Sequence, residues 1–296
     1  VRSSETIREV RELLGKHASH TEIIAKVENQ EGVERLEEIV QEADGVMVAR
    51  GDLGIEVELE DVPQIQRRIA FLCAKYGKRS IVATHMLESM IEHPVPTRAE
   101  VTDVANAVFE ESDAIMLSGE TSIGNYPVRS VETLKRIAKR TEIFPGVNFS
   151  KNLIMEKDGQ HIAASAIQIA SDLKIRAAVV ITRNGRGARY LSNLRAHGVI
   201  IYSFTENAEV LTSNLMYRGV YPFLLKLKKN PEDTIHDALK NYSGRIVELH
   251  ISNPHQRERF RHHSFITSSA DTACIGLGAV GYELITELIC TEADAT

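Results

Sequence analysis

The chain has 296 residues, of which 43% are hydrophobic, and its formal net charge at pH 7 is −6. That length and hydrophobic content suffice for two domains with substantial cores. The negative charge excludes the basic footprint typical of nucleic-acid-binding proteins. No apolar run approaches the length of a membrane span, so we expect neither a nucleic-acid nor a membrane partner.

Cysteine usage indicates a reducing compartment. The three cysteines, Cys73, Cys274 and Cys290, are far apart and odd in number, which argues against a disulfide framework or a zinc site. We therefore expect a cytoplasmic protein. The chain begins at Val1 rather than Met and leads almost directly into a helix; we interpret it as part of something longer.

The first half of the chain alternates short apolar runs with helical stretches. The apolar runs start at Ile23, Val46, Ser80 and Ala114, and continuous runs of this length suit strands that are buried on both faces. Helices are predicted over residues 4–14, 31–42, 62–76, 97–110 and 128–140. Four βα units in a row predict parallel strands with right-handed crossovers, which is half of an eight-fold barrel or a small open sheet.

Helix ends carry recognisable signals. Ser4 is expected to cap the first helix. Gly77 is a stop for the helix over 62–76, which has Pro63 in its first turn. Thr97 and Glu100 make a possible capping box.

A second α/β pattern follows a linker at about residues 143–157. It begins with an amphipathic helix over 161–173, with Ile162, Ala166, Ile169 and Ala170 on one side. Strands are predicted over 177–182, 199–204 and 220–225, and helices over 187–196, 208–217 and 231–240. The fold class is therefore α/β, with a smaller α/β domain after the four βα units.

The first two apolar runs end in charged residues that could act together. Lys26 and Glu28 point to the same side of a strand, because side chains alternate with a period of two. Asp52 ends the next run. Parallel strands bring their carboxyl ends to one edge, where α/β folds place chemistry. Two carboxylates and a lysine can hold a hard divalent cation and an anion together. Charged strand ends are more often only solvated, but four successive runs end in specific polar residues.

Those ends and their surroundings resemble one family. The motifs are K-V-E-N-Q-E-G, V-M-V-A-R-G-D-L-G, A-T-H-M-L-E-S-M-I, P-T-R-A-E-V-T-D-V-A-N-A-V and I-M-L-S-G-E-T. In this order they resemble pyruvate kinase over about residues 5–240. The resemblance implies the second half of the (β/α)8 barrel over 1–143 and the carboxy-terminal effector domain over 158–241. It also implies a glycolytic transferase that moves phosphate from phosphoenolpyruvate to ADP, giving pyruvate and ATP.

The resemblance implies roles for five residues. Lys26 corresponds to the lysine beside the transferring phosphoryl group, where a cation stabilises the charge on its oxygens. Glu28 and Asp52 correspond to the ligands of Mg²⁺ or Mn²⁺. The backbone N–H groups of Gly51 and Asp52 correspond to those that hold the phosphoenolpyruvate carboxylate, and Thr84 to the residue that takes part in proton delivery.

Further implications are less specific. Ser118 and Glu120 correspond to a loop on the nucleotide side. Thr182, Arg183, Asn184, Gly185 and Arg186 correspond to the effector loop, between a strand and a helix, where backbone N–H groups favour phosphate. Asn184 and Gly187 replace the hydroxyl residues of relatives that bind a sugar phosphate, so a plain turn fits as well. The family also uses K⁺ and forms homotetramers.

The resemblance leaves gaps at both ends. The first four barrel strands, the mobile cap domain and the K⁺ ligands have no counterpart here, so we expect this chain alone to be inactive. Residues 242–296 diverge, and Gly276–Gly281 fits G-x-G-x-x-G without the second strand that a dinucleotide site needs. A frame change or a junction with a neighbouring reading frame explains this tail better.

Two other classes of function stay open. One is a metal-dependent carbon–carbon lyase on a related barrel, which also uses a carboxylate pair and an enolpyruvate. The other is a non-catalytic module that binds a sugar phosphate around residues 177–187. An ADP phosphorylation assay separates the first from a kinase, and metal-independent binding would favour the second.

Overall fold

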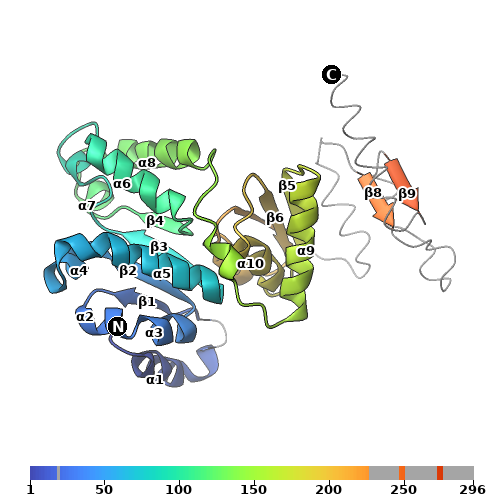
Figure 1. Ribbon diagram of the computed structural model, residues 1–296, viewed down its shortest axis with the longest axis horizontal. Helices are drawn as coiled ribbons and strands as arrows, with labels where there is room; N and C mark the ends of the chain where they lie inside the picture. The colour runs from blue at the N-terminus through green and yellow to red at the C-terminus, as the bar shows by residue number, and fades with distance from the viewer. Residues whose placement is uncertain (19–20, 227–246, 251–271, 276–296) are drawn as a thin grey trace.

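The computed structural model describes residues 1–18, 21–226, 247–250 and 272–275. Two parallel α/β units make up residues 1–226, one built on β1 to β4 and a smaller one on β5 to β7 (Figure 1). A parallel two-stranded ladder pairs β8, Val247–His250, with β9, Thr272–Ile275. The predicted helix over 231–240 and the glycine motif at 276–281 lie outside the described residues.

The first sheet has its strands in sequence order. They are β1 (Ile24–Val27), β2 (Gly45–Ala49), β3 (Arg79–Ala83) and β4 (Ala114–Met116). Neighbours pair in parallel, with Lys26 opposite Met47 and Ala49 opposite Ala83. Sequential order with a helix between strands is the arrangement of half a (β/α)8 barrel, which confirms the predicted fold class.

The helices of this unit follow the strands. They are α1 (Ser4–Leu14), α2 (Gln30–Glu34), α3 (Leu36–Glu42), α4 (Arg50–Glu56), α5 (Val62–Tyr76), α6 (Arg98–Phe109), α7 (Gly119–Ser122) and α8 (Pro127–Thr141). Gly77 ends α5 in the left-handed conformation, at φ 62°. The capping box of Thr97 and Glu100 is present at α6. Both signals behave as predicted.

Three local predictions are wrong. Ser3, not Ser4, occupies the N-cap of α1 and makes no side-chain cap bond. The helix predicted over 31–42 is two helices, because Arg35 leaves the helical conformation at φ −99° and ψ 21°. The run that ends at Ala49 passes directly into α4, so Arg50 to Asp52 form a first helical turn rather than a strand end.

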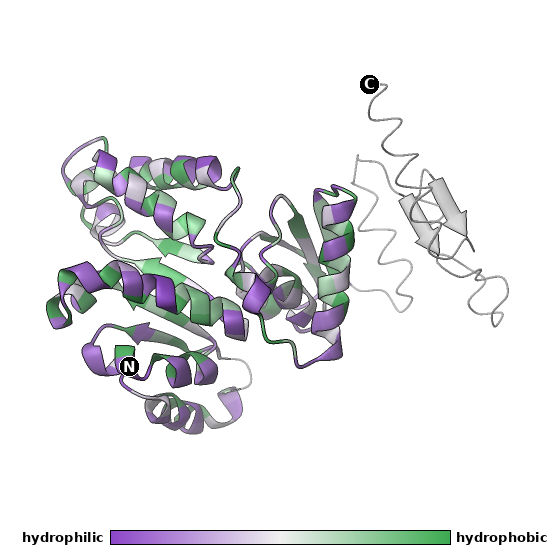
Figure 2. Ribbon diagram, viewed as in Figure 1, coloured by the Kyte–Doolittle hydropathy of each residue, from purple (hydrophilic) through white to green (hydrophobic). Residues whose placement is uncertain are grey.

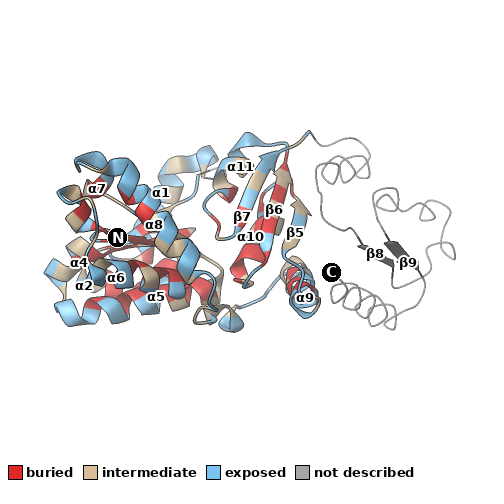
Figure 3. Ribbon diagram, turned by 90° about the horizontal axis from the view of Figure 1, so that it is seen from above, coloured by how far each residue is buried: buried red, intermediate tan, exposed pale blue. Residues whose placement is uncertain are grey.

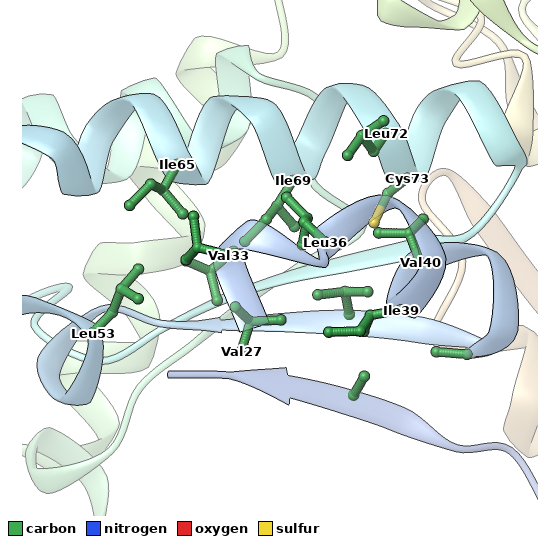
Figure 4. Packing of buried hydrophobic residues seen from close by; sticks show 14 of the residues in the cluster. Val27, Val33, Leu36, Ile39, Val40, Leu53, Ile65, Ile69, Leu72 and Cys73 are labelled. Carbon is green, nitrogen blue, oxygen red and sulfur yellow. The ribbon is translucent and has the colours of Figure 1, made fainter. Parts of the chain in front are cut away.

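The main core lies between the sheet and the helices α3 and α5. Figure 4 shows Ile65, Ile69 and Cys73 of α5 directed toward side chains from α3 and the strands. Val27 and Ile39 are fully buried in this cluster. Hydropathy and burial follow the same division, with apolar strands inside and polar helix faces outside (Figures 2 and 3). Buried strands therefore carry their polar ends out to one edge.

The second unit has strand order β5-β6-β7, all parallel. Its elements are α9 (Asp158–Asp172), β5 (Ala177–Ile181), α10 (Arg186–Asn193), β6 (Ile200–Thr205), α11 (Ala208–Asn214) and β7 (Val220–Leu224). The α9 face is a correction, because Ala163 and Ile167 are buried whereas Ile162 is 70% exposed. The inner face is therefore shifted from the predicted one, although Ala170 belongs to both.

The two units meet at a polar contact that we call the seam. It consists of two clusters, one around Asp113 and Arg195 and one around Arg79, Glu22 and Tyr217. Arg195 binds both carboxylate oxygens of Asp113, at 2.5 and 2.6 Å. Arg79 donates to the Tyr217 hydroxyl at 2.7 Å and pairs with Glu22. Each cluster joins a residue of the first unit to one of the second.

Candidate active site

The predicted charged cluster forms at the carboxyl edge of the first sheet. Lys26 Nζ donates to Asp52 Oδ2 at 2.8 Å and also pairs with Glu28 Oε2. The β1–β2 pairing places these residues together, because Lys26 lies opposite Met47 and Asp52 lies in the first turn after β2. The two carboxylates thus share one ammonium group. The residues that the sequence selected come into direct contact.

This cluster is open to solvent. The side chains of Lys26, Glu28 and Asp52 are 48%, 35% and 53% exposed. Hydrogen bonds to Asp52, and then to Glu28, raise the pKa of Lys26 above its ordinary value. Lys26 therefore stays charged at neutral pH, and the two carboxylates are accessible to another cation from solvent.

The donor set fits a divalent cation. Among the described residues, no group of three or more His, Cys, Asp or Glu side chains is arranged to hold a metal. Magnesium, however, takes only one or two protein carboxylates and leaves other positions to water and substrate phosphate. Glu28 and Asp52 each place an oxygen against the same Lys26 nitrogen, so they are close enough to share one ion. The residues present therefore fit Mg²⁺ or Mn²⁺ bound together with substrate.

Thr84 lies beside this cluster in an unusual backbone conformation. It follows β3 with φ 68°, and His85 follows with φ 52°. The Thr84 hydroxyl accepts the Gly51 N–H at 2.8 Å and donates to the Ala83 carbonyl at 2.6 Å. A Cβ on Gly51 would lie 3.1 Å from the His85 ring. The structure thus joins Thr84 to Gly51, and the amide predicted to hold a carboxylate is engaged by this hydroxyl.

Arg50 lies at the site although the sequence analysis did not select it. It is only 9% exposed, and its guanidinium binds Asp103 and the backbone carbonyls of Thr84 and His85. The signal was present in the sequence, because an arginine that directly follows a buried strand needs internal partners. The distant acid Asp103 carries no such signal, since only the folded chain brings it to Arg50.

Glu120, which was predicted to lie on the nucleotide side, has a structural role in the fold. Glu120 is only 2% exposed, and its carboxylate accepts the Leu87 N–H at 2.9 Å and the Ser118 N–H at 2.7 Å. Glu120 therefore ties the end of β4 to the segment after β3. Ser118 caps α7 by position, and its carbonyl accepts from Ser122 at 3.0 Å. A nucleotide contact for either residue stays a prediction.

The predicted effector loop connects β5 to α10. Thr182 and Gly185 are buried, and Gly185 has φ 76° with Asn214 Oδ1 2.9 Å from a Cβ built there. Arg183 and Asn184 line a cleft that also includes Arg11 of the first unit. Asn184 closes a local turn by accepting the Arg186 N–H at 3.3 Å. The geometry is that of a tight turn with two exposed arginines.

Comparisons with known proteins decide the family. Residues 1–131 match the model of the pyruvate kinase barrel domain, and residues 160–249 match that of the pyruvate kinase alpha/beta domain. The chain belongs to the pyruvate kinase family. It is 43% identical to pyruvate kinase from Geobacillus stearothermophilus over 230 residues, 75% of this chain and 38% of that protein.

Other pyruvate kinases give similar matches. The protein of Hypocrea jecorina is 39% identical over 242 residues, 80% of this chain and 45% of the relative. That of Methanocaldococcus jannaschii is 37% identical over 253 residues, 84% of this chain and 56% of the relative. The chain thus spans between 38% and 56% of the length of these pyruvate kinases.

The end of the chain has a different similarity. Residues 232–290 match the model of dehydroquinase class II, overlapping the end of the pyruvate kinase alpha/beta match. Within the described residues, no helix is long and apolar enough to cross a membrane.

Proposed function

We propose that this chain supplies part of the active site of a pyruvate kinase, which transfers phosphate from phosphoenolpyruvate to ADP. The observation that carries the proposal is the contact of Lys26 with both Glu28 and Asp52 at the carboxyl edge of the sheet. Membership of the pyruvate kinase family supports this reaction, and the cluster supplies a cation and two carboxylates suited to it.

Each residue of the cluster has a distinct task. Glu28 and Asp52 would hold Mg²⁺ or Mn²⁺, and the ion would neutralise charge on the phosphoryl oxygens. Lys26 stabilises the charge that grows on those oxygens in the transition state. Its raised pKa keeps it protonated at neutral pH. The family resemblance assigns the substrate carboxylate to the amides of Gly51 and Asp52. Because the Gly51 N–H donates to the Thr84 hydroxyl in this structure, substrate binding at Gly51 would have to share or replace that bond. Thr84 takes part in delivering a proton to the enolate carbon.

The wider assignments rest on the family alone. They are K⁺ as a second cation, a cytoplasmic homotetramer, Ser118 and Glu120 on the nucleotide side, and an effector loop at Thr182–Arg186. The barrel part extends over 1–143 and the effector domain over 158–241, with 242–296 as a separate tail. We expect the 296-residue chain alone to show no turnover, because it has four parallel strands in its barrel part and spans only 38% to 56% of the length of related pyruvate kinases.

The decisive experiment is an assay of a full-length protein that contains this sequence. Phosphoenolpyruvate, ADP, Mg²⁺ and K⁺ should yield ATP and pyruvate in equal amounts. Cleavage of a carbon–carbon bond without ATP formation would favour the lyase instead. Binding of phosphoenolpyruvate without ATP formation at saturating Mg²⁺ would refute the kinase.

The metal site can be tested on the chain itself. Binding of Mn²⁺, followed by electron paramagnetic resonance, should weaken strongly in Asp52→Asn. Asp61→Asn is the matched control, since Asp61 is an exposed carboxylate in the same part of the chain. Equal Mn²⁺ affinity in the two variants would show that Glu28 and Asp52 do not share the ion.

A further inference from the structure

Two consecutive residues beside the proposed site have left-handed backbones without being glycine. Thr84 has φ 68° and His85 has φ 52°. L-residues avoid this region, and a β-branched residue such as threonine avoids it most strongly. Such conformations persist only where the surroundings enforce them, and they cluster at functional sites. Something in the structure must hold this turn.

The side chain of Arg50 holds it from one side. Nη2 donates to the Thr84 carbonyl at 2.7 Å and to the His85 carbonyl at 2.9 Å. Nε adds a second bond to the Thr84 carbonyl at 3.1 Å. One rigid guanidinium thus binds the carbonyls of both strained residues. A lysine could not reproduce this, because it lacks the planar fork of donors.

Asp103 of α6 fixes the guanidinium in turn. Arg50 Nη1 lies 2.7 Å from Oδ1 and 2.6 Å from Oδ2 of Asp103. Arg50 is buried and the Asp103 side chain is 37% exposed. A charge-assisted pair in which both carboxylate oxygens bind the guanidinium is strong and directional. The orientation of Arg50 therefore depends on α6, which lies beyond α5 and β3 in the chain.

The held turn determines where the Thr84 hydroxyl lies. That hydroxyl accepts the N–H of Gly51, the residue next to Arg50. Two consecutive residues of α4 therefore hydrogen-bond to Thr84: the Arg50 side chain binds its carbonyl, and the Gly51 amide binds its hydroxyl. Asp52, the next residue, pairs with Lys26.

We propose that Arg50, oriented by Asp103, is a positioning residue that keeps the Thr84–His85 turn left-handed and so fixes the Thr84 hydroxyl beside Gly51, at the edge of the proposed substrate site. The catalytic consequence of this placement rests on the proposed function, whereas the effect on the turn does not. Arg50 acts through Thr84, on the transfer of a proton at the enolate carbon. It would not act on a metal ion bound by Glu28 and Asp52.

The first test needs no activity. Backbone ¹³C chemical shifts of Thr84 and His85, measured on the 296-residue chain, report the left-handed conformation directly. Arg50→Lys should move both shifts toward extended values, and Asp103→Asn should move them the same way by less. Arg195→Lys, another buried arginine paired with an aspartate, is the control and should leave them unchanged. Left-handed shifts retained in folded Arg50→Lys, or in Asp103→Asn if Arg50→Lys does not fold, would overturn the proposal.

The second test measures the proton step in the full-length enzyme. Exchange of the pyruvate methyl protons with D₂O should fall about a hundredfold in Arg50→Lys, the loss expected when a reacting group is displaced by about 1 Å. In a Thr84→Ala background, Arg50→Lys should add no further loss. Independent, multiplying losses would overturn the role through Thr84. If the wild-type protein shows neither exchange nor ATP formation, the proposed kinase function is refuted instead. The chemical shifts of Thr84 and His85 would still test whether Arg50 holds the turn.

Discussion

Ionic contacts in two regions of this molecule are built in opposite ways. At the carboxyl edge, Lys26 and its two carboxylates are each at least 35% exposed. At the seam, the side chains of Arg195 and Asp113 are 2% and 1% exposed. Water screens the first group, whereas the second has exchanged water for fixed partners. The edge is thus arranged for exchange of ligands, and the seam for stability and a fixed relation between the units.

The seam shows how such burial is compensated. Asp113 Oδ2 also accepts the Ser80 N–H at 2.9 Å, so its two oxygens meet a guanidinium and a backbone donor. Burial opposes the charged form of Arg195, but Asp113 outweighs this and raises the pKa of the arginine. Removing one partner would therefore leave a buried charge without compensation.

The largest predicted effect is on stability at the seam. Asp113→Ala should lower the free energy of unfolding by about 3–5 kcal/mol, the usual consequence of breaking one side of a buried pair. Urea denaturation followed by circular dichroism measures it. Asp172→Ala, an exposed acid on α9, is the control and should change stability by less than about 0.5 kcal/mol. Similar losses in both variants would mean that the Asp113–Arg195 pair does not hold the units together.

At the edge, the large effect should be on rate instead. In the full-length enzyme, Lys26→Met should lower kcat about a hundred- to a thousandfold, because one preorganised charge is lost from the transition state. KM for phosphoenolpyruvate should stay near its starting value. If Lys26 only orients Glu28, raising Mg²⁺ would restore kcat. Rates measured over a Mg²⁺ series distinguish the two roles.

A smaller effect tests the second cluster of the seam. Tyr217→Phe removes the hydroxyl that lies 2.7 Å from Arg79 but keeps the ring, which stacks 4.1 Å from the guanidinium. The expected loss of stability is about 1.5 kcal/mol, the lower end for a hydrogen bond to a charged group. Tyr221→Phe, on a tyrosine that is 55% exposed, should be neutral. Arg79 also donates to the Ser213 hydroxyl at 3.0 Å and to Glu22. Unchanged stability in Tyr217→Phe would show that these two partners alone satisfy Arg79.

The sequence predicted the local features of both regions. Strand and helix order, Gly77 and the Thr97 box depend on short-range signals, and so did the placement of Lys26, Glu28 and Asp52 at one edge. The sequence did not predict features that depend on contacts between residues far apart in the chain. Nothing near Asp103 or Asp113 indicates that Arg50 and Arg195 will bind them. The left-handed Thr84 was equally hidden, because its neighbours favour an extended strand and only the folded site holds the turn.

The smallest predicted effect is the contribution of the Lys26 ion pairs at the carboxyl edge to the stability of the fold. Lys26→Met should change the free energy of unfolding by at most about 1 kcal/mol, since exposed ion pairs contribute little. The pKa of Lys26 is raised in the folded state, so its contribution is fully present below the unfolded pKa and is lost as pH rises through the folded value. The difference between variant and wild type should accordingly be largest at neutral pH and shrink in strongly alkaline buffer. Urea denaturation at both pH values measures this, with Lys139→Met, an exposed lysine on α8, as control. A loss as large as that of Asp113→Ala would mean that the edge, too, is built for stability, and would remove the contrast between the two regions.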